Sequence, residues 1–155
     1  MRVDEIEDQN LVPDGVYPFR IKKIEIKNGP KSTYLNCELT ITGVGEGAGR
    51  SLFDRIMLGP KSLFRVKNFL LAFGQGGAEL NSVDKDPLTK QIRVDENAFG
   101  REIISLVQGG EACADVGTEE ERENKETGEK YPKRNKVRSY LPIEEAGAAG
   151  IAWPE

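Results

Sequence analysis

The sequence has no histidine, only two cysteines and no long apolar run among its 155 residues. Histidine is the commonest general base and metal ligand, so its absence disfavours an enzyme or a zinc centre. Cys37 and Cys113 are too few for a disulfide framework and lie in alternating apolar segments, so we expect two reduced thiols in the core. No apolar stretch approaches the roughly 20 residues that a membrane span needs. We therefore expect no catalytic residue, no metal or cofactor and no membrane partner.

The two ends of the chain differ in composition from its middle. Residues 1–10, MRVDEIEDQN, are acidic and unlike a secretory leader, so we expect a cytoplasmic protein. The length fits one domain, and 37% hydrophobic against 31% charged residues indicates a modest core. We predict a flexible N-terminus at 1–10, one domain at 11–142 and a flexible C-terminal tail at 143–155.

Charge is unevenly distributed along the chain, whose formal net charge is −4. Cations gather between Arg20 and Lys31 and again between Lys130 and Arg138, whereas acids gather near both ends and in residues 119–129. The distribution of charge decides what a surface attracts more than its sum does. This layout indicates a cationic surface on a protein with acidic ends.

Five segments alternate between apolar and polar residues, as half-buried strands do: 16–27, 32–42, 50–58, 111–118 and 135–141. The first changes phase near Lys22 and Lys23, which predicts a bulge because a strand shifts phase only by an extra residue. In the third, Phe53 fits a core position as well as an exposed one. For the fifth we predict two faces, with Val137, Ser139 and Leu141 inward and Lys136, Arg138 and Tyr140 outward.

A period of 3.6 residues replaces the alternation after the third strand. It predicts a helix over residues 62–73 and a weaker one over 95–107. Residues 75–94 are predicted as loop, and residues 119–132 as a charged excursion that turns at Gly128. Three strands, one or two helices and two strands are the order of the OB fold. We therefore predict a mainly β protein, a five-stranded OB-type barrel with a helix between strands three and four, although other α+β folds share this order.

Cations stand beside aromatic residues on the outward faces of the predicted strands. Cations neutralise phosphates and aromatic rings stack on unpaired bases, so the pattern is typical of single-stranded nucleic-acid binding. The candidate binding residues are Arg20, Lys22, Lys27, Lys31, Tyr34, Asn36, Phe53, Arg55, Lys133, Arg134, Lys136, Arg138 and Tyr140. Each of them also fits an ordinary solvated or structural position. The predicted groove depends on Tyr34 and Tyr140 sharing one face of the sheet.

The acidic residues indicate no metal or catalytic site. The acids of residues 84–86 and 119–129 lack the spacing of a calcium loop, and we interpret them as solvated charge. Asp54 interrupts an apolar strand, so we expect it to pair with Arg55, Arg50 or a backbone group, or to mark a strand end; a lone carboxylate is a poor catalyst. Trp153 and Glu155 put an aromatic beside a terminal carboxylate, which suits docking on a partner or on the chain's own groove. A plain disordered end is the alternative.

Several stretches of the sequence resemble a known family. They read LVPDGVYPFRIKKIEIKNG, STYLNCELTITG, GRSLFDRIML and SLFRVKNFLLAFG within residues 11–74, and NKVRSYLP at 135–142. Together they resemble a phage-encoded family of small OB-like proteins that are found among replication and recombination genes and are regarded as single-stranded-DNA-binding proteins. Residues 75–131 match this pattern poorly. The resemblance implies no catalytic or binding signature that could be carried over to single residues.

The sequence leads to the hypothesis of a single-stranded-DNA-binding protein of phage replication or recombination, without enzymatic activity or strong sequence preference. Replication or recombination proteins would be its partners through the C-terminal tail. One alternative is a protein-interaction or assembly accessory module of a phage. Another is a nuclease or its inhibitor, which the missing histidine disfavours. Homo-oligomerisation and the choice between DNA and RNA stay open.

Overall fold

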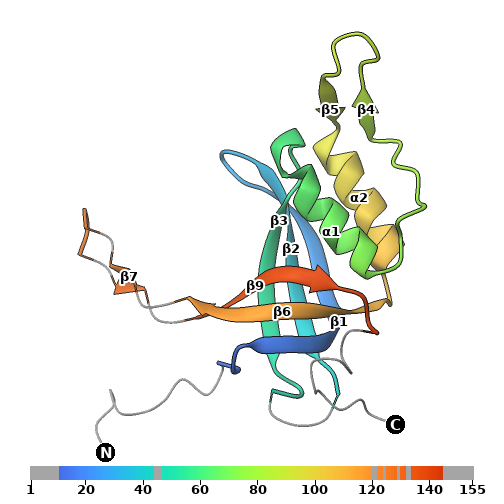
Figure 1. Ribbon diagram of the computed structural model, residues 1–155. Coiled ribbons are helices and arrows are strands. Elements are labelled where there is room, and N and C mark those ends of the chain that lie inside the picture. The colour runs from blue at the N-terminus through green and yellow to red at the C-terminus, as the bar shows by residue number, and fades with distance from the viewer. Residues whose placement is uncertain are drawn as a thin grey trace, which may run out of the picture.

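Strands and two helices make up the described part of the chain, which is residues 11–43, 47–119, 122–123, 125–128, 130–131 and 134–144 of a computed structural model (Figure 1). In chain order the elements are β1 (Gly15–Asn28), β2 (Thr33–Ile41), β3 (Ser51–Met57), a 3-10 turn (Pro60–Ser62), α1 (Leu63–Ala72), β4 (Val83–Lys85), β5 (Ile92–Val94), α2 (Glu96–Val107), β6 (Glu111–Glu119), β7 (Arg122–Glu123), β8 (Lys130–Tyr131) and β9 (Arg134–Leu141).

Five of the strands form one antiparallel sheet in the order β3-β2-β1-β6-β9. The pairs β4-β5 and β7-β8 form two small separate sheets. Both helices fall between β3 and β6 in the chain. The prediction of a mainly β protein with helices between its third and fourth principal strands is therefore confirmed, and β3 and β9 are the edge strands of the main sheet.

The central strand β1 carries a β-bulge. Its register against β2 shifts between Ile21 and Lys23, so Lys22 is the extra residue, which confirms the bulge predicted there. A bulge bends its strand and increases the local twist. The strand pairs with β6 over Gly15–Arg20 and with β2 over Phe19–Asn28, so it joins the two halves of the sheet.

The inward and outward faces of β2 and β3 are well separated. In β2 the inward side chains are those predicted: Leu35, Cys37, Leu39 and Ile41 are all buried. In β3, Leu52 and Ile56 are buried, whereas Phe53 is 63% exposed and Met57 is also exposed. The ambiguity of the third strand is therefore resolved, and Phe53 lies on the outer surface.

The two helices lie side by side across one end of the sheet (Figure 1), with α1 against β3 and β9 and α2 against β1 and β2. Asp95 caps α2 by accepting a hydrogen bond from the backbone N–H of Ala98. At Gly100, a Cβ atom would come within 2.8 Å of Ile26 Cγ1, so this glycine allows α2 to approach β1 closely. No helix in the described residues is long and apolar enough to cross a membrane.

Residues 75–94 contain the β4-β5 hairpin, so the prediction that they form a loop is wrong. Strands of three residues are too short to show an alternating pattern. Backbone N–H groups of Thr89 and Leu88 donate to the Asp86 carboxylate, hold the turn and lower the pKa of Asp86. The hairpin projects beyond the helices (Figure 1).

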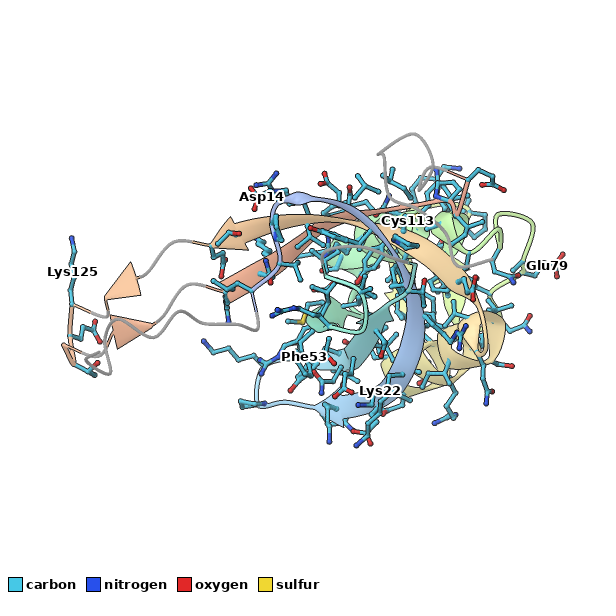
Figure 2. The ribbon with its side chains drawn as sticks, turned by 90° about the horizontal axis from the view of Figure 1, so that it is seen from below. Asp14, Lys22, Phe53, Glu79, Cys113 and Lys125 are labelled. Atoms are coloured by element: carbon cyan, nitrogen blue, oxygen red, sulfur yellow. The ribbon has the colours of Figure 1, made fainter. Side chains whose placement is uncertain are left out.

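The charged excursion between β6 and β9 is an extended arm. Its β7 and β8 pair with each other, and Gly128 adopts a positive φ of 73° between them, where the sequence predicts the turn. Figure 2 shows Lys125 at the end of this arm, far from the sheet. Residues 125–128, at the end of the arm, are exposed.

The predicted facing of Tyr140 is wrong, because β9 also carries a bulge. Against β6, Asp115 pairs with Ser139 and Val116 with Val137, which leaves Arg138 as the extra residue. The extra residue shifts the phase of the strand, so that Val137 and Tyr140 both point inward. The Tyr140 ring is buried against its neighbours Phe19 and Phe69.

Candidate nucleic-acid interface

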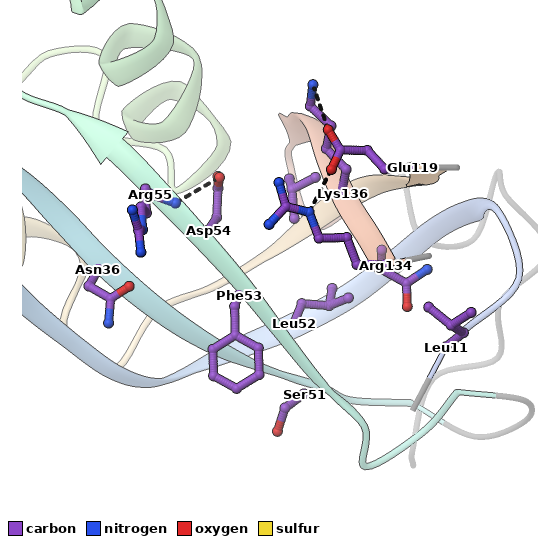
Figure 3. Close-up of a pocket in the computed structure, with 12 residues that line it drawn as sticks. Leu11, Asn36, Ser51, Leu52, Phe53, Asp54, Arg55, Glu119, Arg134 and Lys136 are labelled. Atoms are coloured by element: carbon purple, nitrogen blue, oxygen red, sulfur yellow. Dashed lines mark hydrogen bonds and ion pairs between the residues drawn. The ribbon is translucent and has the colours of Figure 1, made fainter. Parts of the chain in front are cut away.

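A groove lies between the edge strands β3 and β9 (Figure 3). In the described chain no hydrogen-bonded ladder joins these two strands. The groove has a volume of about 700 Å³ and is lined by Leu11, Asn36, Ser51, Leu52, Phe53, Asp54, Arg55, Glu119, Arg134, Asn135, Lys136 and Val137. This volume is within the range of small-ligand clefts.

Arg65 from α1 joins the two edge strands at the inner side of the groove. Its Nη2 donates to Asp54 Oδ2 of β3 at 2.7 Å and to the Val137 carbonyl of β9 at 3.1 Å, and its Nη1 donates to the Arg138 carbonyl at 2.9 Å. The Tyr140 hydroxyl donates to the same Asp54 oxygen at 2.6 Å. We call Asp54, Arg65 and Tyr140 the latch.

Asn68 extends the same connection one turn further along α1. Its Nδ2 donates to the Tyr140 carbonyl at 3.0 Å, and its Oδ1 accepts from the Tyr140 N–H at 2.8 Å. The side-chain amide thus satisfies both backbone groups of one β9 residue, as a neighbouring strand would. Side chains of α1 therefore replace part of the missing ladder along β9.

Burial sets the electrostatics of the latch. It raises the pKa of the Asp54 carboxyl, an effect that the hydrogen bond from Tyr140 and the charge of Arg65 oppose. Burial, and then the charge of Asp54, also raises the pKa of Tyr140 well above its ordinary value. The phenol therefore stays protonated and remains a hydrogen-bond donor.

The outer face of β2 and β3 carries rings and a cation beside the groove. Across the two strands Tyr34 pairs with Met57, Asn36 with Arg55, and Glu38 with Phe53. The Arg55 guanidinium lies over the Tyr34 ring, 5.1 Å from its centroid. We call Tyr34, Phe53 and Arg55 the ring face.

Most predicted cations near the ring face are paired with carboxylates of the chain itself. Lys22 pairs with Glu38 and Lys27 with Glu25, each at 3.2 Å. At the other wall of the groove Glu119 pairs with Arg134 at 2.5 Å and with Lys136 at 3.8 Å (Figure 3). These pairs are exposed at their cationic ends, and such pairs contribute little to stability.

The structure brings together only part of the predicted site. Five predicted residues line the groove: Asn36, Phe53, Arg55, Arg134 and Lys136. Tyr34, Lys22 and Lys27 belong to the neighbouring sheet surface. Tyr140 is in the core. The other predicted residues do not line the groove or lie outside the described residues.

Arg20, Lys31 and Arg138 do not line the groove. Arg20 pairs with Glu111 of β6 at 3.2 Å, and Lys31 is exposed in the turn between β1 and β2. The Arg138 guanidinium pairs with Asp14 at 3.5 Å and covers Gly117, where it would overlap any Cβ atom. Lys133, Trp153 and Glu155 lie outside the described residues, so their predicted roles stay predictions.

Sequence reasoning missed several residues of the groove. Ser51, Leu52, Asn135, Glu119 and Leu11 line it without having been candidates. Asp54 had a usable signal, because a carboxylate in an apolar strand requires a partner and an arginine is the best one. Nothing in the sequence pointed to Arg65, which lies on the polar side of a predicted helix.

The two thiols are predicted to be unreactive in the folded protein. Cys37 and Cys113 are both buried, and burial raises the pKa of Cys37 to about 12. Because the thiolate is the reactive form, a thiol reagent at neutral pH should modify neither residue until the chain unfolds and both after unfolding. Absorbance after addition of a disulfide reagent, with and without denaturant, measures this. Rapid modification without denaturant would contradict it.

The described residues contain no group of three or more acidic, cysteine or histidine side chains that could hold a metal ion. The arrangement of the groove and the ring face thus offers charge, rings and hydrogen-bonding groups.

No protein-family model matches this sequence, and no curated protein is similar enough to it to serve as a relative.

Proposed function

We propose that this chain binds single-stranded DNA across the ring face and the adjacent groove, without strong sequence preference and without catalysis. The observation that carries the proposal is the Phe53 side chain, which is 63% exposed on a strand beside Arg55 and at the rim of a groove with cations on its far wall. An exposed ring is a stacking platform for an unpaired base, and nearby cations attract the phosphates.

The proposal includes a sheet of the OB type. The OB fold is a partly open, five-stranded Greek-key barrel that binds oligonucleotides on the face of its second and third strands. The strand order β3-β2-β1-β6-β9 and the latch that draws β3 towards β9 support this assignment. The ring face lies on the corresponding strands, β2 and β3.

The buried position of Tyr140 makes the proposed surface smaller than the one predicted from sequence. The predicted groove with Tyr34 and Tyr140 on one face is wrong, because the Tyr140 ring is buried against Phe69 in the core. The rings that remain are Tyr34 and Phe53, four residue positions apart along the β2-β3 ladder, or about 13 Å at strand spacing. This distance leaves room for more than one nucleotide between the two rings.

The ion pairs indicate how DNA would bind. Phosphates would replace Glu38 at Lys22 and Glu119 at Arg134 and Lys136, so binding exchanges one anion for another at the same cations. Arg55 forms no ion pair within the described chain and is held over Tyr34 instead. It is therefore the cation that a phosphate could reach without displacing a carboxylate.

The biological setting of this proposal rests on the family resemblance described above. That resemblance favours a role in phage replication or recombination, with the C-terminal tail as the contact for other proteins of those processes. Residues 145–155 lie outside the described residues, so this part depends on the sequence alone.

A salt titration of binding tests the proposed function. A labelled oligo(dT) of about 12 nucleotides is expected to bind more tightly than a duplex of equal length, because only unpaired bases expose faces to Tyr34 and Phe53. With about five cations at the surface and a dependence of roughly −0.7 per phosphate contact, the slope of log K against log salt should be about −3.5. Fluorescence anisotropy at several salt concentrations measures both.

The matched control compares charge reversals on two surfaces. The double variant Arg134→Glu with Lys136→Glu should weaken oligo(dT) binding at least tenfold at low salt, since repulsion replaces attraction at the groove. Lys61→Glu with Lys67→Glu makes the same charge change on exposed positions beside and on α1 and should leave binding within about threefold. No binding at low salt, or equal losses in both variants, would contradict the proposal.

A protein-interaction module is the second candidate, and the exposed side of α1 favours it. Phe64 is 75% exposed and Leu71 is 47% exposed, and they lie two turns apart on the same side of the helix. Large contiguous apolar patches mark protein contacts, and these two side chains would form the centre of such a contact on α1. This candidate predicts that oligonucleotides do not bind even at low salt.

A further inference from the structure

The two carboxylate oxygens of Asp54 accept different numbers of hydrogen bonds. Its Oδ2 accepts hydrogen bonds from both Arg65 and Tyr140, whereas its Oδ1 accepts one, from the backbone N–H of Arg55 at 2.9 Å. A carboxylate oxygen can accept about two hydrogen bonds. Figure 3 shows the bond to the Arg55 N–H. The side chain is 14% exposed and Asp54 lines the groove, and within the described chain Oδ1 accepts no second hydrogen bond.

The surroundings of Asp54 suit a flat, partly polar ligand. Leu52 and Val137 supply apolar walls, the Phe53 ring stands at the rim, and Arg55 and Arg134 lie where phosphates would pass. A volume of about 700 Å³ exceeds what a few water molecules require. Asp54 Oδ1 is a hydrogen-bond acceptor, so it favours a ligand that places an N–H donor next to it.

We infer that the groove holds one unstacked base of the bound strand and prefers bases with an exocyclic amino group, which donates to Asp54 Oδ1. This inference rests on the proposed function and adds a base preference to it. Carboxylates recognise cytosine by accepting from its N4 amino group. Thymine and uracil present an O4 acceptor at that position, which a carboxylate oxygen repels.

The preference is tested first with the unmodified protein, so that folding does not enter. Oligonucleotides of about 12 residues containing only deoxycytidine or only deoxyuridine differ in the group at position 4 of the ring. At neutral pH and constant salt the deoxycytidine strand should bind about fivefold more tightly, the low end of the range for one base contact. A strand of N4,N4-dimethyldeoxycytidine, which cannot donate, should lose this advantage.

The variant Asp54→Asn tests which residue carries the preference. Arg65 and Tyr140 both donate, so the new amide must turn its oxygen towards them and place its NH₂ at the position of Oδ1, where the hydrogen bond from the Arg55 N–H is lost. A donor then stands where the acceptor was, and the preference should shift from deoxycytidine towards deoxyuridine. Because the readout is a ratio of two affinities, a general loss of stability does not imitate it. Asp84→Asn makes the same substitution at an exposed residue of β4 outside the groove, so this matched control should keep the original ratio.

The outcomes separate this inference from the proposed function. Equal, salt-dependent binding of the deoxycytidine and deoxyuridine strands would overturn the base preference and leave the single-strand proposal standing. Binding of neither strand at low salt would overturn both. A preference for deoxycytidine that persists unchanged in Asp54→Asn would show that Asp54 does not read the amino group, and would also overturn the inference.

Discussion

Replacing Arg65 with alanine is expected to lower the free energy of unfolding by roughly 3 kcal/mol, the low end of the range for breaking a buried ion pair. The Arg65 and Asp54 side chains are only 23% and 14% exposed. Loss of Arg65 leaves the Asp54 charge in a poorly solvated site and removes the donors to the Val137 and Arg138 carbonyls. For a chain of this length the midpoint of thermal unfolding should fall by roughly 6–12 °C.

A nearby substitution is the control for this prediction. Lys67→Ala removes a long cation from the same helix, but Lys67 is exposed, so stability should change by less than about 0.5 kcal/mol. Urea unfolding followed by circular dichroism measures both variants. If Arg65→Ala changes stability no more than Lys67→Ala does, the latch does not hold β3 and β9 together.

Replacing Phe53 with alanine is expected to weaken binding of single-stranded DNA by about 5- to 150-fold, which corresponds to roughly 1–3 kcal/mol for one base stacked on one ring. The ring is 63% exposed, so its loss should scarcely affect the free energy of unfolding. Tyr34→Ala should weaken binding in the same range, and it also removes the surface on which Arg55 lies. Anisotropy titrations at one salt concentration give the affinities.

Phe64→Ala is the matched control for Phe53→Ala. It removes the same ring from a position that is 75% exposed, but on α1 rather than on the ring face. Its affinity for oligo(dT) should stay within about twofold of the unmodified protein, because no base is expected to reach α1. Equal effects of the two substitutions would mean that the DNA, if bound, does not lie on the ring face.

These two predictions separate what stabilises the fold from what binds the ligand. The latch lies on the inner side of the groove and its loss acts on stability, whereas the ring face lies outside and its loss acts on affinity. Asp54 is the residue where the two meet, since one of its oxygens serves the latch and the other is the acceptor that we infer for a bound base. For that reason its substitution is assessed by a ratio of affinities and not by affinity alone.

Local patterns predicted the elements that depend on nearby residues. The alternation of β2, the bulge at Lys22 and the helix that begins after Asp95 each follow from side chains within a few positions along the chain. The exposed side of β3 could not be predicted in this way, since Leu52 and Phe53 are both large and apolar. Contact with the core decided between them.

Tyr140 shows why the candidate site was only partly predictable. The pattern of β9 alone places Tyr140 beside Lys136 and Arg138, and one extra residue in its pairing with β6 reverses that result. The sequence of a short polar strand does not reveal a bulge at an arginine. The bulge is defined by how β9 pairs with β6, and the residues of β9 alone do not show that pairing. Arg138 was likewise assigned to the binding face, but the bulge directs it towards Asp14 and Gly117.

By itself, the sequence determined a mainly β chain with a bent first strand, two helices before its last two principal strands and two buried thiols, because period, phase and capping are local properties. The tertiary structure alone decided that Tyr140 is a core residue, that Arg65 joins two edge strands and that a groove lies between them. Asp54 and Tyr140 are 86 residues apart, and Arg65 reaches β9 over a separation of 72. Contacts over such separations exist only once the sheet has assembled, so no pattern of neighbouring residues encodes them.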